Sequence, residues 1–479
     1  MEFAQPAMAE VKQNFPTPLR IAVIGSGPSA FYAADFLQRQ SPVAVEIDMF
    51  ERLPTPFGLV RGGVAPDHPK IKAVTRAYER IARHPNFRFY GNVEFGRDLT
   101  HQDLVRHYHA IIYAVGAQTD RRLGIPGEDL PGSHAATEFV GWYNGHPDYC
   151  DLTFDLTQEA AVVVGNGNVA MDVARILARS YAELLPTDIA PHALEALRES
   201  RVRTIYVLGR RGPAQAAFTN PEIKELDELA EADVIVAPED VKLDPLSQAS
   251  IESQKDRTAA RNVEILTEYA NRPPSGKPRQ IVMRFLVSPV ELLGSERVEA
   301  VRIVKNELYQ AADGSLRPRP TGETEVIPAG LVFRSIGYHG LALPDVPFDS
   351  ASGTIPNVEG RVMEPDGTFR RGEYAVGWIK RGPTGIIGSN KPDALETVER
   401  LLEDAAAGRL LEPPHPERTE MECLLERRHI HYVTFDDWRI IDQIEQERGR
   451  AIGRERVKFI RVEDMLAALA DFRREPTPG

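Results

Sequence analysis

Cysteine, membrane-length apolar runs and basic tracts are scarce in this 479-residue chain. The two cysteines, Cys150 and Cys423, are far apart and form neither a CxxC pair nor a four-cysteine set. Their spacing excludes a redox-active dithiol and an iron–sulfur cluster held by the chain itself. No apolar run approaches the length of a membrane helix, and the net charge of -13 argues against nucleic acid as a partner. We therefore expect a cytoplasmic protein of roughly two to four domains.

We expect no targeting signal at the beginning of the chain. The first eighteen residues contain acids, lack an apolar core and are poor in arginine, unlike a secretory signal or a transit peptide. We predict that residues 1–18 are a disordered lead-in. The twelve histidines show no metal-ligand spacing, so we expect no metal site.

Two glycine-rich fingerprints lie about 140 residues apart. Residues 21–30 read IAVIGSGPSA and contain Gly25, Gly27 and Ala30; residues 161–170 read AVVVGNGNVA and contain Gly165, Gly167 and Ala170. Each fingerprint follows a short apolar run, typical of a buried parallel strand, and precedes a stretch of helical periodicity. Such a turn directs backbone N–H groups and the positive end of a helix at a pyrophosphate. Two copies in this context predict two dinucleotides on one chain.

The strand after each fingerprint distinguishes the two sites. After the first, VEIDMFE ends in Glu51, whose carboxylate can accept hydrogen bonds from both ribose hydroxyls. After the second, TIYVLGRR ends in Arg210 and Arg211, whose guanidinium groups suit a 2′-phosphate. We expect FAD at the first site and NADP at the second. The alternative is that the two arginines are solvated loop charges.

The order of the motifs predicts one domain inserted into another. Two segments, AIIYAVGA at 110–117 and GLVFRSIG at 330–337, are similar: in each, an apolar strand runs into a tight turn at a glycine. We expect an FAD-binding domain from 19–118 and 337–479, with an NADP-binding domain at 119–336 and a helical C-terminal tail. Residues 247–270 are expected to form one polar helix. The predicted fold class is α/β with two Rossmann-like domains, as in glutathione-reductase-like flavoproteins.

Several longer motifs resemble adrenodoxin reductase and the bacterial adrenodoxin-type ferredoxin–NADP reductases. They are PFGLVRGGVAPDHP at 56–69, FVGWYNG at 139–145, GRRGPAQAAFT at 209–219, GWIKRGPTG at 377–385 and VTFDDW at 433–438. The resemblance spans about residues 19–470. It implies an FAD-dependent NADPH:ferredoxin oxidoreductase, in which a hydride passes from NADPH to FAD and single electrons pass to a ferredoxin-type iron–sulfur protein.

The resemblance also assigns cofactor contacts by position. The FAD contacts that it implies are Ala30, Glu51, Leu59, Phe95, Trp378, Gly385, Ile386 and Ile387. The NADP contacts that it implies are Arg121, Asn166, Gly167, Asn168, Val169, Arg210, Arg211, Glu222 and Gly385. Because two cofactor rings must meet near Gly385, the missing side chain there suits both. Trp378 could instead be an ordinary core aromatic.

His68 and Asp172 are the catalytic candidates, because in the family these positions lie near the flavin ring. They could manage a proton or order the ring region, since hydride transfer itself depends mainly on positioning. Asp172, expected on the first turn of its helix, could equally be a partner of the helix dipole. His68 could be a turn residue of the Asp67-His68-Pro69 sequence.

Two other functions remain open at this point. The chain could reduce a small acceptor such as a quinone, or it could be a dinucleotide-binding electron-input subunit of a larger complex. A ferredoxin is usually acidic, so a basic docking patch is expected despite the net charge of -13. The basic residues of Arg201–Arg211, together with Lys380 and Arg381, are the expected docking residues.

Overall fold

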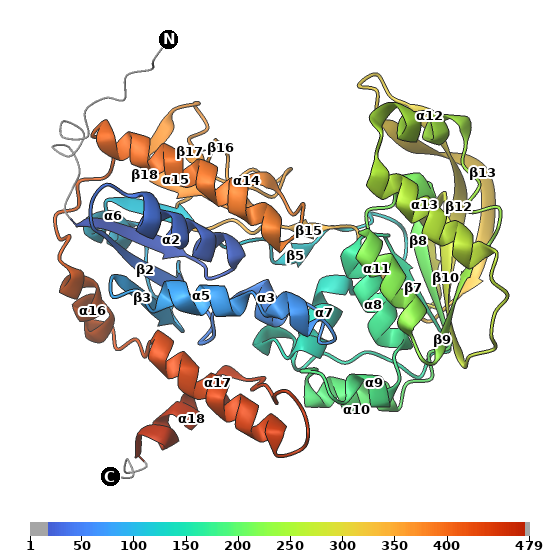
Figure 1. Ribbon diagram of the computed structural model, residues 1–479, viewed down its shortest axis with the longest axis horizontal. Coiled ribbons are helices and arrows are strands. Elements are labelled where there is room, and N and C mark those ends of the chain that lie inside the picture. The colour runs from blue at the N-terminus through green and yellow to red at the C-terminus, as the bar shows by residue number, and fades with distance from the viewer. Residues whose placement is uncertain (1–17, 475–479) are drawn as a thin grey trace.

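The computed structural model describes residues 18–474, which form two α/β domains side by side (Figure 1). The expected disordered lead-in at 1–18 lies almost wholly outside the described residues. In the described part, no helix combines the length and the apolar character that crossing a membrane would require.

The first domain is built on a seven-stranded sheet with the order β16-β17-β18-β4-β1-β2-β3. Strands β3, β2, β1, β4 and β18 are parallel, and β16 and β17 add an antiparallel edge. The central strand β1 is buried along its whole length because helices cover both faces of the sheet. The bounds are β1 (Leu19–Ile24), β2 (Val45–Glu51), β3 (Phe87–Gly91), β4 (Ala110–Tyr113), β16 (Asn357–Val358), β17 (Arg361–Met363) and β18 (Phe369–Ala375).

Helices from both ends of the chain cover this sheet. Helix α2 (Pro28–Gln40) starts directly after Gly27 with a proline in its first turn, a residue that suits a helix start. It packs against α15 (Asn390–Ala406). The remaining helices are α3 (Leu59–Gly62), α4 (Pro69–Lys72), α5 (Thr75–Ala82), α6 (His101–His107) and α14 (Trp378–Arg381).

The second domain contains a six-stranded, all-parallel sheet with the order β6-β14-β7-β8-β10-β9. Its strands are β6 (Ser133–Ala135), β7 (Ala160–Val164), β8 (Thr204–Gly209), β9 (Ala232–Val236), β10 (Arg279–Phe285) and β14 (Leu331–Arg334). Its helices are α7 (Ala136–Asn144), α8 (Asn168–Ala178), α9 (Tyr181–Leu184), α10 (Pro191–Arg198), α11 (Asn220–Glu225), α12 (Pro245–Gln254) and α13 (Arg257–Ala270). An antiparallel sheet of β11 (Val287–Leu293), β12 (Ala300–Gln310) and β13 (Leu316–Pro328) completes it.

The second domain is an insertion in the first. Strand β18 returns to pair in parallel with β4, although more than 250 residues separate them. Where the chain passes between the two sheets, β5 (Thr119–Asp120) pairs antiparallel with β15 (Tyr338–His339). The predicted fold class, with one dinucleotide-type domain inserted in the other, is confirmed.

One expected helix is in fact two. The predicted helix at 247–270 is interrupted at Lys255, whose φ of 51° lies in the left-handed region. Asp256 then caps the second helix by accepting hydrogen bonds from the backbone N–H groups of Thr258 and Ala259. The prediction was wrong because uniform polarity hides a break that depends on a cap.

The C-terminal tail contacts both domains and stabilises their relative arrangement. It contains α16 (Arg418–Arg427), α17 (Phe435–Arg450) and α18 (Val462–Arg474). Between α17 and α18, the Lys458 Nζ lies 3.0 Å from a carboxylate oxygen of Asp188 in the second domain. Asp188 also accepts from Lys72 of the first domain at 2.6 Å. The two lysines hold the pKa of Asp188 below its usual range despite burial, whereas burial lowers the pKa of Lys458 to about 7.

We expect Asp188→Asn to destabilise the protein, because it leaves the buried Lys458 and the half-buried Lys72 without their shared anion. Breaking a buried pair on one side costs about 3–5 kcal/mol, measurable as a lower urea midpoint. The control Asp151→Asn removes an exposed partner of Arg461 and should leave the midpoint nearly unchanged. Equal urea midpoints for the two variants would contradict a stabilising role of Asp188 between the domains.

Candidate functional site

The first glycine turn lies between β1 and α2. Gly25 has a φ of 100°, and a Cβ there would come within 2.5 Å of the Ala114 carbonyl oxygen. A Cβ at Gly27, in contrast, would meet no protein atom within 4 Å. At the end of β2, Glu51 accepts hydrogen bonds from the backbone N–H and the hydroxyl of Ser26, at 3.1 and 2.6 Å. The turn is therefore closely packed behind and open in front, as a pyrophosphate cradle requires.

The second turn, between β7 and α8, repeats this geometry. Gly165 has a φ of 128° and a Cβ there would meet the Ser335 carbonyl oxygen at 2.1 Å. At Gly167 the nearest atom to an added Cβ is the Cβ of Ala217, at 3.9 Å. Two polar atoms beside this turn, Asn166 Nδ2 and Gln215 Oε1, are buried and have no hydrogen-bond partner among residues 18–474. Buried polar groups are normally paired, so these atoms fit a site that a polar ligand completes.

Arg210 and Arg211 follow β8 at the carboxyl edge of the second sheet. Within the described residues, neither guanidinium has a carboxylate within 4.0 Å, although most arginines of this chain do. Burial and the neighbouring Arg210 lower the pKa of Arg211. Two adjacent cations of this kind have the charge and the hydrogen-bond donors that suit a phosphate group.

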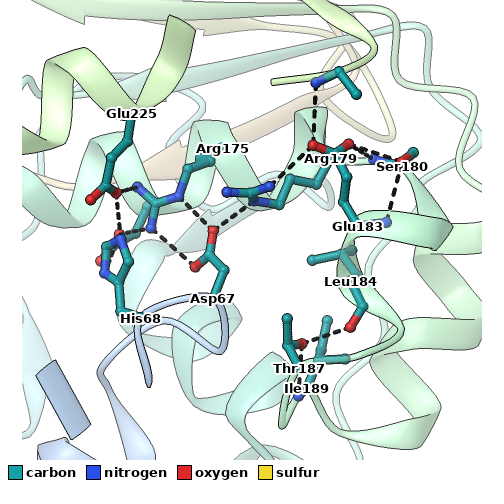
Figure 2. A network of polar contacts seen from close by, with 12 residues as sticks. Asp67, His68, Arg175, Arg179, Ser180, Glu183, Leu184, Thr187, Ile189 and Glu225 are labelled. Atoms are coloured by element: carbon teal, nitrogen blue, oxygen red, sulfur yellow. Dashed lines mark hydrogen bonds and ion pairs between the residues drawn. The ribbon is translucent and has the colours of Figure 1, made fainter. Parts of the chain in front are cut away.

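A buried ionic cluster joins the two domains (Figure 2). Arg175 of α8 is fully buried, and its Nε donates to Asp67 at 2.7 Å across the domain interface. Arg179, one helical turn later, donates to the same carboxylate at 2.7 Å. Arg175 also pairs with Asp172 at 2.6 Å and Glu222 at 3.2 Å.

His68 enters the same cluster from the first domain. Its Nε2 lies 2.6 Å from Glu225 Oε2, and its Nδ1 lies 3.9 Å from Asp172 Oδ1. Burial alone would lower the pKa of His68, but the hydrogen bond to Glu225 raises it above its ordinary value. Burial and the nearby Asp172 raise the pKa of Glu222 to about 7. The cluster therefore contains groups that can exchange protons near neutral pH.

The structure brings together three residues that the sequence placed far apart. Donor atoms of His68, Asp172 and Glu222 lie within 4.8 Å of one another. This spacing could suit a metal ion, but the Arg175 guanidinium already pairs with both carboxylates. Asp172 lies beyond the first turn of α8, so the expectation of a first-turn position, and with it a dipole partner, is wrong.

Sequence reasoning missed the residues that hold the cluster together: Asp67, Arg175, Arg179 and Glu225. A signal was present in two of them. Arg175 follows Asp172 by three residues, and Glu225 follows Glu222 by three, a spacing that places each pair on one helix face. That Arg175 and Asp67 meet across the interface could not be read from spacing, because they are 108 residues apart.

The glycine-rich run at 377–385 lies between β18 and α15. Trp378 is half-buried rather than a core aromatic; its ring centroid is 5.2 Å from that of Tyr338, and its Nε1 donates to the Thr384 carbonyl. Gly385 has a φ of 81° and is exposed, and Ile386 beside it is 59% exposed. A Cβ at Gly385 would come within 2.6 Å of the Ser389 hydroxyl oxygen, so the run needs glycine at this position. The exposed apolar side chain of Ile386 beside it suits a ring that stacks there.

The other predicted contact residues occupy different environments. Ala30 is fully buried in α2, while Leu59 and Phe95 are half-buried. Arg121 is exposed, with its Cδ 3.8 Å from where a Cβ of Gly337 would lie. Asn168 begins α8, and its Oδ1 accepts from the backbone N–H of Thr219. Ile387 packs against the core of the first domain.

Lys380 is not a docking residue. It is 8% exposed, and its Nζ donates to Glu396 at 2.6 Å and to the Thr397 hydroxyl at 3.0 Å. The expectation that Lys380 faces a partner was therefore wrong. Sequence alone hides this burial because a long cationic side chain can pair inside as well as reach outside.

Comparison with known proteins agrees with this geometry. A model of the family described as pyridine nucleotide-disulphide oxidoreductase matches residues 19–208. NADPH-ferredoxin reductase FprA of Mycobacterium tuberculosis is 46% identical over 457 residues, which cover 94% of this chain and 98% of that protein. Human mitochondrial NADPH:adrenodoxin oxidoreductase is 42% identical over 462 residues, which cover 94% and 92%. A solved structure of M. tuberculosis FprA in complex with NADPH superimposes with a TM-score of 0.90 at 45% identity, covering 95% and 100%.

The fold and its two glycine turns define an oxidoreductase of the two-dinucleotide flavoprotein class. More narrowly, the chain belongs to the family of NADPH–ferredoxin and adrenodoxin reductases that these relatives represent. The resemblance identified from the sequence motifs is confirmed. Despite the description of the matching family model, both cysteines of this chain are free.

We expect Glu225→Gln to lower the pKa of His68, because it removes the carboxylate that accepts from the imidazole. Stability from this pair is present below the unfolded pKa of about 6.5 and is lost as pH rises through the raised native value. Titration of the histidine ring by NMR measures the shift. Glu228→Gln, at an exposed position nearby, is the control, and an unchanged His68 pKa in the Glu225 variant would refute the coupling.

Proposed function

We propose that the chain is an FAD-dependent NADPH:ferredoxin oxidoreductase. One observation carries the proposal: two open glycine turns are followed by opposite charges, Glu51 at one and Arg210 with Arg211 at the other. A carboxylate suits a ribose with free hydroxyls, and two unpaired guanidinium groups suit a 2′-phosphate. The proposed FAD-binding domain comprises 19–118 and 337–479, and the proposed NADP-binding domain comprises 119–336.

The FAD-side residues fit the dinucleotide by their local geometry. Gly25 and Gly27 shape an open turn at the positive end of α2, and Glu51 lies at the adjoining strand end. The full set that we propose for FAD is Gly25, Gly27, Ala30, Glu51, Leu59, Phe95, Trp378, Gly385, Ile386 and Ile387.

The NADP-side residues are suitable because several of their polar groups have no hydrogen-bond or ion-pair partner in the described part of the chain. The buried amide nitrogen of Asn166 and the two unpaired arginines are the strongest of these. The full set that we propose for NADP is Arg121, Asn166, Gly167, Asn168, Val169, Arg210, Arg211, Glu222 and Gly385.

The bound flavin supplies the chemistry of accepting a hydride and releasing single electrons. The residues of this chain position the two nucleotides, which is the main contribution that a protein makes to hydride transfer. We propose that His68 and Asp172 are the catalytic residues. They lie in the ionic cluster between the domains, where they can hold a proton and fix the ring region.

The names of the relatives support the choice of acceptor. The M. tuberculosis relative is named an NADPH-ferredoxin reductase, and the human one acts on adrenodoxin according to its name. We propose a transient ferredoxin-type iron–sulfur partner for this chain. We also propose a cytoplasmic location, because the two cysteines remain free as in proteins of reducing compartments; cell fractionation tests this.

The proposed function predicts two separable reactions of the purified holoprotein. In stopped flow, NADPH should bleach the flavin absorbance, and an added oxidised ferredoxin should restore it and accelerate cytochrome c reduction. Because Gly167 lies at the open face of the second turn, Gly167→Val should keep the yellow colour but slow bleaching. Rapid reduction of a quinone or a dye with no effect of ferredoxin would favour a small-acceptor reductase. No bleaching by NADPH would favour a binding subunit.

We expect Arg210→Gln/Arg211→Gln to weaken NADPH binding and leave NADH nearly unaffected. Each lost charge-assisted hydrogen bond contributes about 1.5–3 kcal/mol, so the NADPH preference should fall by roughly ten- to a thousandfold. The ratio of kcat/KM for the two coenzymes measures it. The control Arg201→Gln/Arg203→Gln removes two exposed arginines before the start of β8. Full NADPH preference in the Arg210/Arg211 variant would place the phosphate site elsewhere.

A further inference from the structure

Residues 69–84 form a basic segment in an acidic protein. This segment, which contains α4 and α5, holds five Lys or Arg and one Glu, whereas the chain as a whole has a net charge of -13. Lys70, Arg76 and Arg80 are exposed, and Ile71 between them is 42% exposed. We call these four side chains the α4–α5 patch.

The cations of the patch lack internal partners. In the described part of the chain no carboxylate lies within 4.0 Å of Lys70, Arg76 or Arg80, whereas the neighbours Lys72 and Arg83 pair with Asp188 and Glu79. Arg76 and Arg80 are four residues apart on α5 and so project from one helix face. Exposed cations that share a face and have no partner repel one another, and an external anion relieves that repulsion.

The patch begins at the proposed redox site. Helix α4 starts directly after His68, so Lys70 is two residues from the cluster that joins the domains. In Figure 1, α5 and α3 follow one another along the side of the first domain that leads to α7 and the second domain. Single electrons pass efficiently only over short distances, so a partner must dock close to this region.

The docking residues expected from the sequence are less suitable. Arg201 and Arg203 precede the six-residue strand β8, and Arg210 follows it. At about 3.3 Å per residue, Arg203 lies roughly 23 Å from Arg210 at the carboxyl edge. Arg210 and Arg211 are assigned to the coenzyme phosphate, and Lys380 is buried. The α4–α5 patch, in contrast, is exposed, begins beside the ionic cluster and is not assigned to a coenzyme.

We propose that the α4–α5 patch is the docking surface for the acidic iron–sulfur protein that receives the electrons; this rests on the proposed function. Lys70, Arg76 and Arg80 would face carboxylates at the rim of that partner, and Ile71 supplies an apolar contact among them. The acidic remainder of the chain disfavours an extended polyanion or an anionic membrane, which would also face the surrounding negative surface.

The test compares two triple variants of the holoenzyme with a purified acidic [2Fe–2S] ferredoxin. The patch variant is Lys70→Gln/Arg76→Gln/Arg80→Gln. The control, Arg201→Gln/Arg203→Gln/Arg257→Gln, removes the same charge from the second domain. All three arginines are exposed, and within residues 18–474 none of them forms an ion pair. Ferredoxin affinity is measured by calorimetry at low and high salt, and NADPH-dependent ferricyanide reduction reports the flavin site.

We expect the patch variant to bind ferredoxin about tenfold more weakly at low salt and to lose most of its salt dependence. Ferricyanide reduction should stay within about twofold of wild type, and the control should bind like wild type. Equal ferredoxin binding by the patch variant and wild type would overturn the proposal. A second result would also overturn the proposal: anionic phospholipid vesicles bind the wild-type protein but not the patch variant, while both proteins bind ferredoxin equally. If wild-type protein reduces ferricyanide but neither binds nor reduces ferredoxin, the proposed function itself fails.

Discussion

The buried pairing of Asp67 with Arg175 and Arg179 is the interaction on which the arrangement of the two domains depends. Asp67 belongs to a loop of the first domain, and both arginines belong to α8, the helix that follows the second glycine turn. The two guanidinium groups hold the pKa of Asp67 below its usual range, against the effect of burial. An anion that is buried and doubly paired cannot leave without a large desolvation cost. It therefore fixes α8, and the turn that precedes it, relative to the first domain.

The C-terminal tail fixes the same interface from another side. The Arg454 guanidinium donates to backbone carbonyls of the second domain, and Glu445 pairs with Arg61 of the first. Arg61 in turn lies over the ring of Trp438, 5.0 Å from its centroid. A hydride moves only when donor and acceptor rings are aligned, so a rigid interface serves this chemistry better than a hinge. The tail and the Asp67 pairing give that rigidity without covering either glycine turn.

Sequence reasoning succeeded where function depends on local pattern. The strands, the glycine turns and the insertion could be predicted because apolar runs and glycine spacing are short-range signals. It failed where the environment of a side chain depends on a partner that is distant in the sequence. Lys380 was expected at the surface but finds Glu396 and Thr397 on α15. Asp172 was a catalytic candidate with a helix-dipole partner as the alternative, and it pairs with Arg175, which also donates to Asp67 in the other domain. Spacing along a chain does not show which charges meet across an interface.

Charges without internal partners are the most informative ones in this molecule. Surface ion pairs are numerous in this protein, and each contributes little to its stability. An arginine that forms such a pair is therefore weak evidence for a functional site. Arg210 and Arg211 depart from that pattern at a strand end, beside buried polar atoms that also lack partners. Lys70, Arg76 and Arg80 depart from it at exposed positions of the first domain. We propose that the first environment binds the phosphate of a coenzyme, because half-buried Arg211 and buried polar atoms lie beside exposed Arg210. We propose that the second binds a protein carrier, because all three of its cations are exposed.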